Sequence, residues 1–155
     1  MGFFNAFGYK FYVKAGTSAS TAPTASTGMV EVKNLSNAGI SSSTDTQEVI
    51  TYDTSTNGWK QQIVTANSYT ISCELNIDTE DAGYKLLKEA ARDSATGKMV
   101  EWIRETPMAA GGTSAEKHAG VAAVGNFSED IQAGNVAKCT FDLVGYGPYV
   151  LTEAA

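Results

Sequence analysis

The sequence contains few of the residues that build metal and nucleophilic sites. Its 155 residues include one histidine, two cysteines and three prolines. A Ser-His-Asp or Cys-His site would have to use His118, which lies in a Gly/Ala-rich stretch and is expected to be a solvated loop residue. Neither Cys73 nor Cys139 belongs to a C-x-x-C pair, which argues against a zinc site. Both lie on apolar faces of predicted strands, so we expect two reduced thiols in the core.

Long apolar runs, phosphate-binding motifs and an excess of positive charge are also missing. No stretch approaches about 18 apolar residues, so we expect no membrane span. The sequence has neither G-x-x-x-x-G-K-[ST] nor G-x-G-x-x-G. Its net charge of −6 disfavours a conventional nucleic-acid binder, which needs a basic patch. Asp78, Glu80 and Asp81 lack the glycine and distal glutamate of a calcium loop. We therefore predict that the protein is not an enzyme and has no catalytic, cofactor-binding or metal-binding residues.

Alternation of apolar and polar side chains predicts strands within one domain over residues 1–155. The clearest strand spans residues 68–77, with one buried and one wet face. Its apolar face holds Tyr69, Ile71, Cys73, Leu75 and Ile77, and its polar face holds Thr70, Ser72, Glu74 and Asn76. A strand over residues 136–146 likewise sets Ala137, Cys139, Phe141 and Leu143 against Lys138, Thr140 and Asp142. Further strands are predicted over residues 9–15, 29–35, 98–105 and 119–131.

A helical pattern follows the clearest strand. Asp78 is a candidate N-cap, and the acids after it suit the positive end of a helix dipole. An apolar stripe at helical spacing is formed by Gly83, Leu86, Leu87 and Ala90. The sequence therefore predicts one helix over about residues 78–93.

A polar stretch over about residues 37–64 precedes that strand. Its second half contains two short β-like runs around D-T-S-T-N-G, where Asn57 and Gly58 supply the positive φ angles of a tight turn. We predict a long extended loop or hairpin arm that projects from the body. The order of elements predicts a mainly β fold, with two antiparallel sheets packed as a sandwich or partial barrel and the helix on its flank.

Two acidic residues, Glu74 and Asp142, lie on the polar faces of the two best alternating strands. They either keep a sheet soluble or line a channel, because a wide barrel alternates core-facing and lumen-facing positions along each strand. A carboxylate wall would let DNA slide, since phosphates beside it gain no counterion-release energy. Lys138 on the same face would make such a wall mixed in charge.

The segment from the arm to the helix, residues 59–91, reads W-K-Q-Q-I-V-T-A-N-S-Y-T-I-S-C-E-L-N-I-D-T-E-D-A-G-Y-K-L-L-K-E-A-A. An arm, a long alternating strand and an acid-rich entry into a D-x-G-x-x-x-L-type helix resemble the central region of phage major tail tube proteins. The polar segment 39–58, with its E-V-I-T-Y run, is similar to that family's inter-subunit loop. The F-D-L-V-G-Y-G ending is similar to family ends.

The resemblance implies a structural virion protein that is made in the bacterial host cytoplasm and assembled into the phage tail. In that family six subunits close a ring around a shared inner barrel, and rings stack into a tube that passes DNA without binding it specifically. The candidate lumen-facing residues are then Thr70, Ser72, Glu74, Asn76, Lys138, Thr140 and Asp142. The candidate ring-stacking loop contains Gln47, Glu48, Tyr52, Asp53, Asn57 and Trp59. The implied partners are further copies of the chain, a tape measure protein inside, terminator and baseplate proteins at the ends, and a sheath if the tail is contractile.

Other functions stay open at this point. The main alternative is a non-enzymatic binding module, such as a capsid decoration or carbohydrate-binding protein, and a small hydrolase comes third. The tube of type VI secretion systems shares the family's fold. The sequence therefore separates neither phage from secretion machinery nor contractile from flexible tails.

Overall fold

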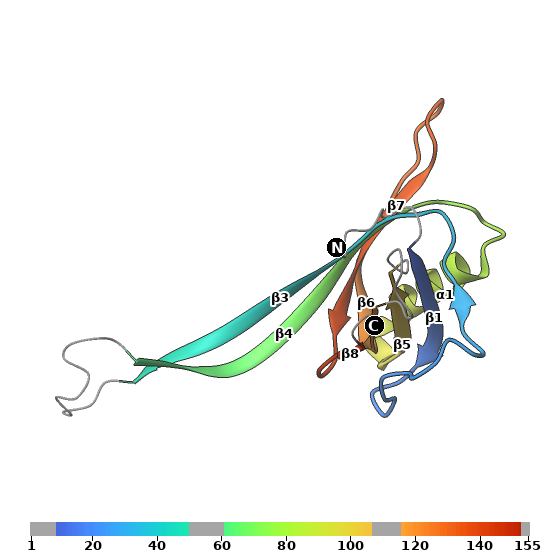
Figure 1. Ribbon diagram of the computed structural model, residues 1–155. Coiled ribbons are helices and arrows are strands. Elements are labelled where there is room, and N and C mark those ends of the chain that lie inside the picture. The colour runs from blue at the N-terminus through green and yellow to red at the C-terminus, as the bar shows by residue number, and fades with distance from the viewer. Residues whose placement is uncertain (1–8, 50–60, 107–115, 153–155) are drawn as a thin grey trace, which may run out of the picture.

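In the computed structural model, the described residues 9–49, 61–106 and 116–152 form an open antiparallel sheet of eight strands beside one α-helix (Figure 1). The strand order is β2-β1-β5-β6-β7-β4-β3, and β8 pairs with β6. The elements are β1 (Lys10–Gly16), β2 (Val30–Glu31), β3 (Leu35–Val49), β4 (Gln61–Asn76), α1 (Ala82–Arg92), a short 3-10 helix (Ser94–Thr96), β5 (Met99–Glu105), β6 (Lys117–Asp130), β7 (Lys138–Gly145) and β8 (Val150–Thr152).

The predicted mainly β class with a flanking helix and a projecting arm is confirmed. The two expected sheets are halves of one sheet joined through β6, which pairs with β5 over residues 117–122 and with β7 over residues 122–130. Figure 1 shows β1, β5, β6 and α1 gathered in the body, while β3 and β4 continue away from it as a long arm. Trp102 of β5 and Phe141 of β7 belong to the same hydrophobic cluster, so both halves share one core.

The core is organised around the fully buried Trp102. Its ring stacks on Phe11 of β1 at a centroid distance of 6.1 Å and meets Tyr69 of β4 edge-on at 5.9 Å. The Trp102 indole N–H donates to the Tyr69 hydroxyl (3.3 Å), which donates to the Val121 carbonyl (3.0 Å). A Cβ at Gly145 would overlap the Tyr69 ring, so β7 requires glycine where it passes this side chain. One aromatic cluster with satisfied polar atoms therefore ties β1, β4, β5 and β6 together.

The arm and the clearest predicted strand are parts of the same element. β3 and β4 pair along their described lengths, and β4 is 16 residues long. Residues 37–46, predicted only as part of the extended segment, lie in β3. Residues 41–48 and 62–68 are exposed on both faces of the outer arm. Because neither face is buried, the sequence there does not alternate between apolar and polar residues, and alternation is the pattern that would have predicted a strand. The predicted turn at residues 57–58 lies outside the described residues.

The prediction of Asp78 as the helix cap is wrong. α1 begins after Asp81, whose carboxylate accepts hydrogen bonds from the Gly83 N–H and the Lys33 N–H, each at 3.1 Å. Asp78 instead accepts from the Glu80 N–H in the preceding turn (3.0 Å). Asp81 is buried and joins the helix start to the segment after β2. The hydrogen bond from the Lys33 N–H, which is distant in sequence, explains why Asp81 and not Asp78 occupies the cap position.

The apolar stripe of α1 packs toward the sheet as predicted. Gly83, Leu87 and Ala90 are buried, and Leu86 is partly buried. A Cβ at Gly83 would lie 2.9 Å from the Val32 Cα, so glycine lets the first turn of the helix approach the backbone after β2.

The remaining strands lie near their predicted positions, with shifted ends. The strand expected over residues 29–35 is reduced to β2, because Asn34 adopts a positive φ of 62° before β3 begins. β8 was not predicted, since its three residues are all exposed and show no alternation.

Candidate functional surface

The predicted lumen-facing residues lie together on the face of β4 and β7 that points away from the core. In the β4–β7 ladder Ser72 is opposite Asp142, Glu74 is opposite Thr140, Asn76 is opposite Lys138, and Thr70 is opposite Val144. The residues between them on each strand, such as Cys73 and Phe141, are buried. Because side chains alternate along a strand, this burial places the predicted set on the outer face.

The same face continues across β3 and β6, which contain none of the predicted lumen-facing residues. We call this four-strand surface the polar wall. Its further members are Asn37, Gly39 and Ser41, beside β4, and Gly125, Ser128 and Asp130, beside β7. In the sequence, the alternation of Ala38 and Ile40 with Gly39 and Ser41 could have indicated that β3 has one buried and one outer face. That signal is weak because small residues replace the polar ones.

Charged groups of both signs lie in the polar wall. The Lys138 ammonium is 3.8 Å from the Glu74 carboxylate, in an exposed pair that adds little stability. Asp142 accepts a hydrogen bond from the Asn126 amide (3.0 Å). Asn126 has a positive φ of 53° and lies where the β6–β7 register shifts, in a bulge that bends β6. The polar wall therefore carries charges of both signs, as the position of Lys138 in the sequence predicted.

The polar wall ends at two strand edges that have no strand partner among the described residues. β3 is the last strand of the sheet, and β6 has no β5 partner beyond Ala122. The four strands alternate in direction, so the two edges run in opposite directions. Ala38 and Ile40 on β3 and Phe127 on β6 are only partly buried there. A long unpaired edge is a template for pairing with another chain.

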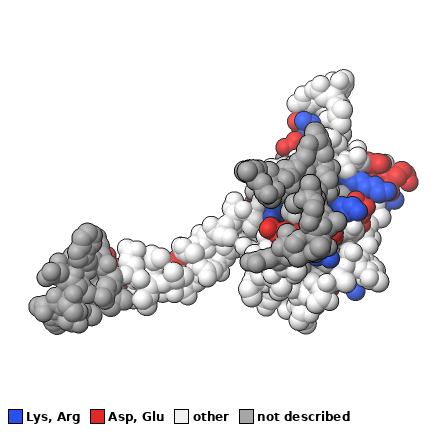
Figure 2. All heavy atoms as spheres, viewed as in Figure 1, with Lys and Arg blue, Asp and Glu red and all other residues white. Residues whose placement is uncertain are grey.

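The predicted ring-stacking residues divide at the end of the described arm. Gln47 and Glu48 lie on β3 and are exposed. The others lie outside the described residues: Tyr52, Asp53, Asn57 and Trp59. Figure 2 shows that the viewed face of the arm carries few charged side chains, whereas both signs gather on the body. The described arm therefore offers mainly small polar and apolar groups for contact.

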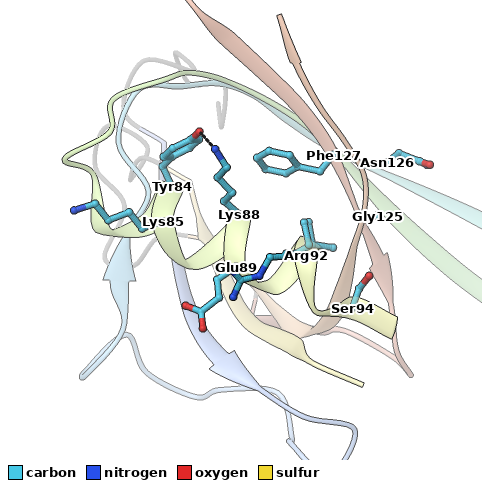
Figure 3. Close-up of a pocket in the computed structure, with 11 residues that line it drawn as sticks. Tyr84, Lys85, Lys88, Glu89, Arg92, Ser94, Gly125, Asn126 and Phe127 are labelled. Atoms are coloured by element: carbon cyan, nitrogen blue, oxygen red, sulfur yellow. Dashed lines mark hydrogen bonds between the residues drawn. The ribbon is translucent and has the colours of Figure 1, made fainter. Parts of the chain in front are cut away.

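A groove of about 640 Å³ separates α1 from the unpaired part of β6 (Figure 3). The Tyr84 hydroxyl donates to the Glu129 carboxylate (2.8 Å), and the Lys88 ammonium is 2.9 Å from the same carboxylate. Lys88 also lies 3.3 Å from the Tyr84 hydroxyl, as the dashed line in Figure 3 marks. The hydrogen bond from Lys88 holds the pKa of Glu129 below its ordinary value. This cluster fixes the helix to β6.

Both cysteines are free and buried. Burial raises the pKa of Cys73 to about 12 and that of Cys139 to about 11, so both thiols stay protonated at neutral pH. In the described part of the chain, no group of three or more His, Cys, Asp or Glu side chains could hold a metal ion. None of the described helices is long and apolar enough to cross a membrane.

The expectation that His118 is a solvated loop residue is wrong. His118 lies in β6 opposite Arg104 of β5, and it is buried. Its Nδ1 is 3.4 Å from the Arg104 guanidinium, and its Nε2 is 3.7 Å from the Glu116 carboxylate. Its ring lies 5.6 Å from that of Tyr149. Arg104 also donates to the Ala38 carbonyl (2.7 Å) and so links β5 to the base of the arm. Pairing with β5 turns this Gly/Ala-rich stretch into a strand.

Mild acidification should destabilise the fold through His118. Burial, followed by the Arg104 guanidinium, holds the pKa of His118 below its ordinary value of 6.5. The unfolded chain then binds more protons at this residue, so its stabilising contribution is present above about pH 6.5 and is lost as pH falls through the folded pKa. We expect the urea midpoint to fall between about pH 7.5 and about pH 5.5, and His118→Gln to flatten that fall. An equal pH slope in the variant would contradict this account.

One known family accounts for this arrangement over most of the chain. The family model described as phage tail tube protein matches residues 12–150. The chain belongs to the phage tail tube protein family. It is thus a structural tail tube subunit of the virion, as the resemblance implied. Membership of this family favours the tail tube function over the two alternatives, a binding module and a small hydrolase. No curated protein sequence matches this tail tube subunit.

Solved tail and tube structures share the fold of this tail tube subunit. The tail of an empty gene transfer agent particle, refined with C6 symmetry, is 14% identical with a TM-score of 0.68, and the match covers 97% of this chain and 100% of that chain. The SPP1 tail tube is 13% identical with a TM-score of 0.64, covering 92% of this chain and 75% of that chain. The sixfold-symmetrised baseplate of the anti-feeding prophage gives 11% identity and a TM-score of 0.62, covering 97% of each chain.

Proposed function

We propose that six copies of this tail tube subunit close a ring, that rings stack into a tube, and that the polar wall lines a channel through which DNA passes. The observation that carries this proposal is the polar wall. It is backed on one side by the core, faces solvent on the other, and ends at two unpaired edges. Thr70, Ser72, Glu74, Asn76, Lys138, Thr140 and Asp142 then face the lumen.

Ring closure follows from the two edges of the polar wall. Because the edges run in opposite directions, a rotation that brings β3 of one copy beside β6 of the next makes an antiparallel pair. Every copy then uses both edges, so a closed ring leaves none exposed. The partly buried Ile40 and Phe127 would gain cover on the core side of that pair. The C6 symmetry of the gene transfer agent tail supports six copies.

The surface of the polar wall suits passage of DNA rather than capture. Glu74 and Asp142 repel phosphates, and the nearby Glu74 carboxylate partly neutralises Lys138. The remaining members are mainly small polar residues and glycines, which offer no cluster of cations for counterion release. The net charge of −6 per copy acts in the same direction.

Stacking and partner binding follow from the same assembly. The arm extends away from the body (Figure 1), and Gln47, Glu48 and the loop beyond them would contact a neighbouring ring. A tape measure protein would occupy the lumen before DNA passes. Terminator and baseplate proteins would close the tube ends, and a sheath would surround a contractile tail. Matches to a baseplate and to a sheath/tube terminator of contractile injection systems support these partners.

Electron microscopy of concentrated protein tests the ring. Wild-type protein is expected to form rings with a central hole, which stack into tubes. Ile40→Glu should prevent closure, because it places a charge at the core side of the β3 edge. Ile63→Glu is the control, since Ile63 is exposed on the arm, away from that edge, and its rings should persist. Compact monomers from concentrated wild-type protein would contradict the proposal.

A further inference from the structure

We propose that the turn between β6 and β7 is a second ring-stacking contact, separate from the arm, and that it docks on the far end of β7 in a copy belonging to the next ring. This inference rests on the proposed tube. We call residues 131–137 the β6–β7 tip. The β7–β8 patch consists of the exposed side chains Val144, Tyr146, Val150 and Leu151.

The β6–β7 tip presents apolar side chains that no described segment covers. Ile131 is 70% exposed and Val136 is 67% exposed, the highest values among the large apolar side chains that the structure describes. The tip extends beyond the last β4–β7 pair, Asn76 with Lys138. Figure 1 shows it as the orange hairpin that projects from the top of the body. Two apolar side chains at the end of a projecting hairpin indicate a contact with another molecule.

The β7–β8 patch lies at the opposite end of the same strand. β7 runs from Lys138, beside the tip, to Gly145. Val144 lies near its C-terminal end, Tyr146 follows it, and Val150 and Leu151 lie in β8. Figure 1 shows this red turn at the lower end of the body. Tyr146 is 51% exposed and Val150 is 53% exposed. The subunit therefore carries one apolar surface at each end of β7.

The chemistry of the two surfaces points to a second copy as the occupant. Residues 131–137 and 143–152 contain no Asp, Glu, Lys or Arg. Contact between them would desolvate no charge, whereas a nucleic-acid partner would need cations. Two different surfaces at opposite ends of one subunit make a head-to-tail contact, which repeats along an axis instead of closing. A copy displaced along the tube therefore places its tip on the patch of its neighbour.

Paired variants test the proposal through tube length in electron micrographs. The tip variant carries Ile131→Asp and Val136→Asp, and the patch variant carries Tyr146→Asp and Leu151→Asp. Each alone should still form rings, with tubes at least about tenfold shorter than wild type because the loss is repeated in every copy around the ring. Rings formed separately from each variant and then mixed in equal amounts should give pairs of stacked rings. In each pair one intact tip meets one intact patch, whereas each outer end of the pair carries an altered tip or patch and adds a further ring far less readily.

Thr79→Asp with Ala82→Asp is the matched control, because it adds the same number of charges at exposed positions beside the start of α1, outside the tip and the patch. Its tubes should keep wild-type length. If an aspartate variant fails to fold, Ile131→Thr with Val136→Thr should give the same shortening. Wild-type lengths from the folded tip variant, equal shortening by the control, or a mixture without ring pairs would each overturn the proposal. Absence of rings from wild-type protein would instead overturn the proposed function.

Discussion

Tubes assembled from Glu74→Lys/Asp142→Lys subunits should retain DNA that wild-type tubes release. Both residues lie in the polar wall, and each substitution reverses a charge in every copy around the lumen. The new lysines would neutralise phosphates and release counterions, which the wild-type wall does not. If six or more phosphates are neutralised, affinity should fall by roughly 10³-fold or more between 50 and 200 mM salt. Co-sedimentation of labelled DNA with tubes across that salt range measures the effect.

Two further variants separate lumen charge from net charge. Glu31→Lys/Glu80→Lys makes the same change in net charge at exposed positions outside the polar wall, and it should retain much less DNA. Glu74→Gln/Asp142→Asn removes the carboxylates without adding cations, and it should bind DNA weakly. Equal retention by the wall variant and the Glu31/Glu80 variant would mean that the polar wall does not line the DNA path.

Trp102→Ala should lower the free energy of unfolding by about 3–5 kcal/mol. The side chain is fully buried between Phe11 and Tyr69, and its removal leaves a large cavity where the two halves of the sheet meet. Since a domain of this kind is stable by only about 5–15 kcal/mol, the variant should be close to unfolding at 37 °C. Urea denaturation of wild type and variant measures the difference.

Trp102→Phe is the control for that loss. It keeps a ring against Phe11 and removes the indole N–H, while the Tyr69 hydroxyl can still donate to the Val121 carbonyl. We expect it to cost clearly less than the alanine variant. A loss below about 1 kcal/mol for Trp102→Ala would show that this aromatic cluster does not hold the two halves together.

Sequence reasoning succeeded where a strand has one buried and one wet face. Alternation along β4 and β7 assigned Ile71 and Phe141 to the core and Glu74 and Asp142 to the opposite face, and the structure agrees: the first two are buried and the last two are only partly buried. It predicted the projecting arm but did not place the strand β3 in it, because both faces of the outer arm are exposed and no period appears there. It also failed for His118, whose Gly/Ala-rich surroundings have the composition of a loop but are held as a strand by β5.

The sequence by itself determined the mainly β class, the buried faces of β4 and β7, and the family, because side-chain alternation and local motifs are properties of neighbouring residues. Only the tertiary structure decided that β3 and β6 complete the polar wall and leave its two edges unpaired. It also decided that Asp81 rather than Asp78 caps the helix, and that apolar side chains lie at both ends of β7. These features depend on pairing between segments far apart in the chain, and strand register and edge exposure exist only once those segments meet.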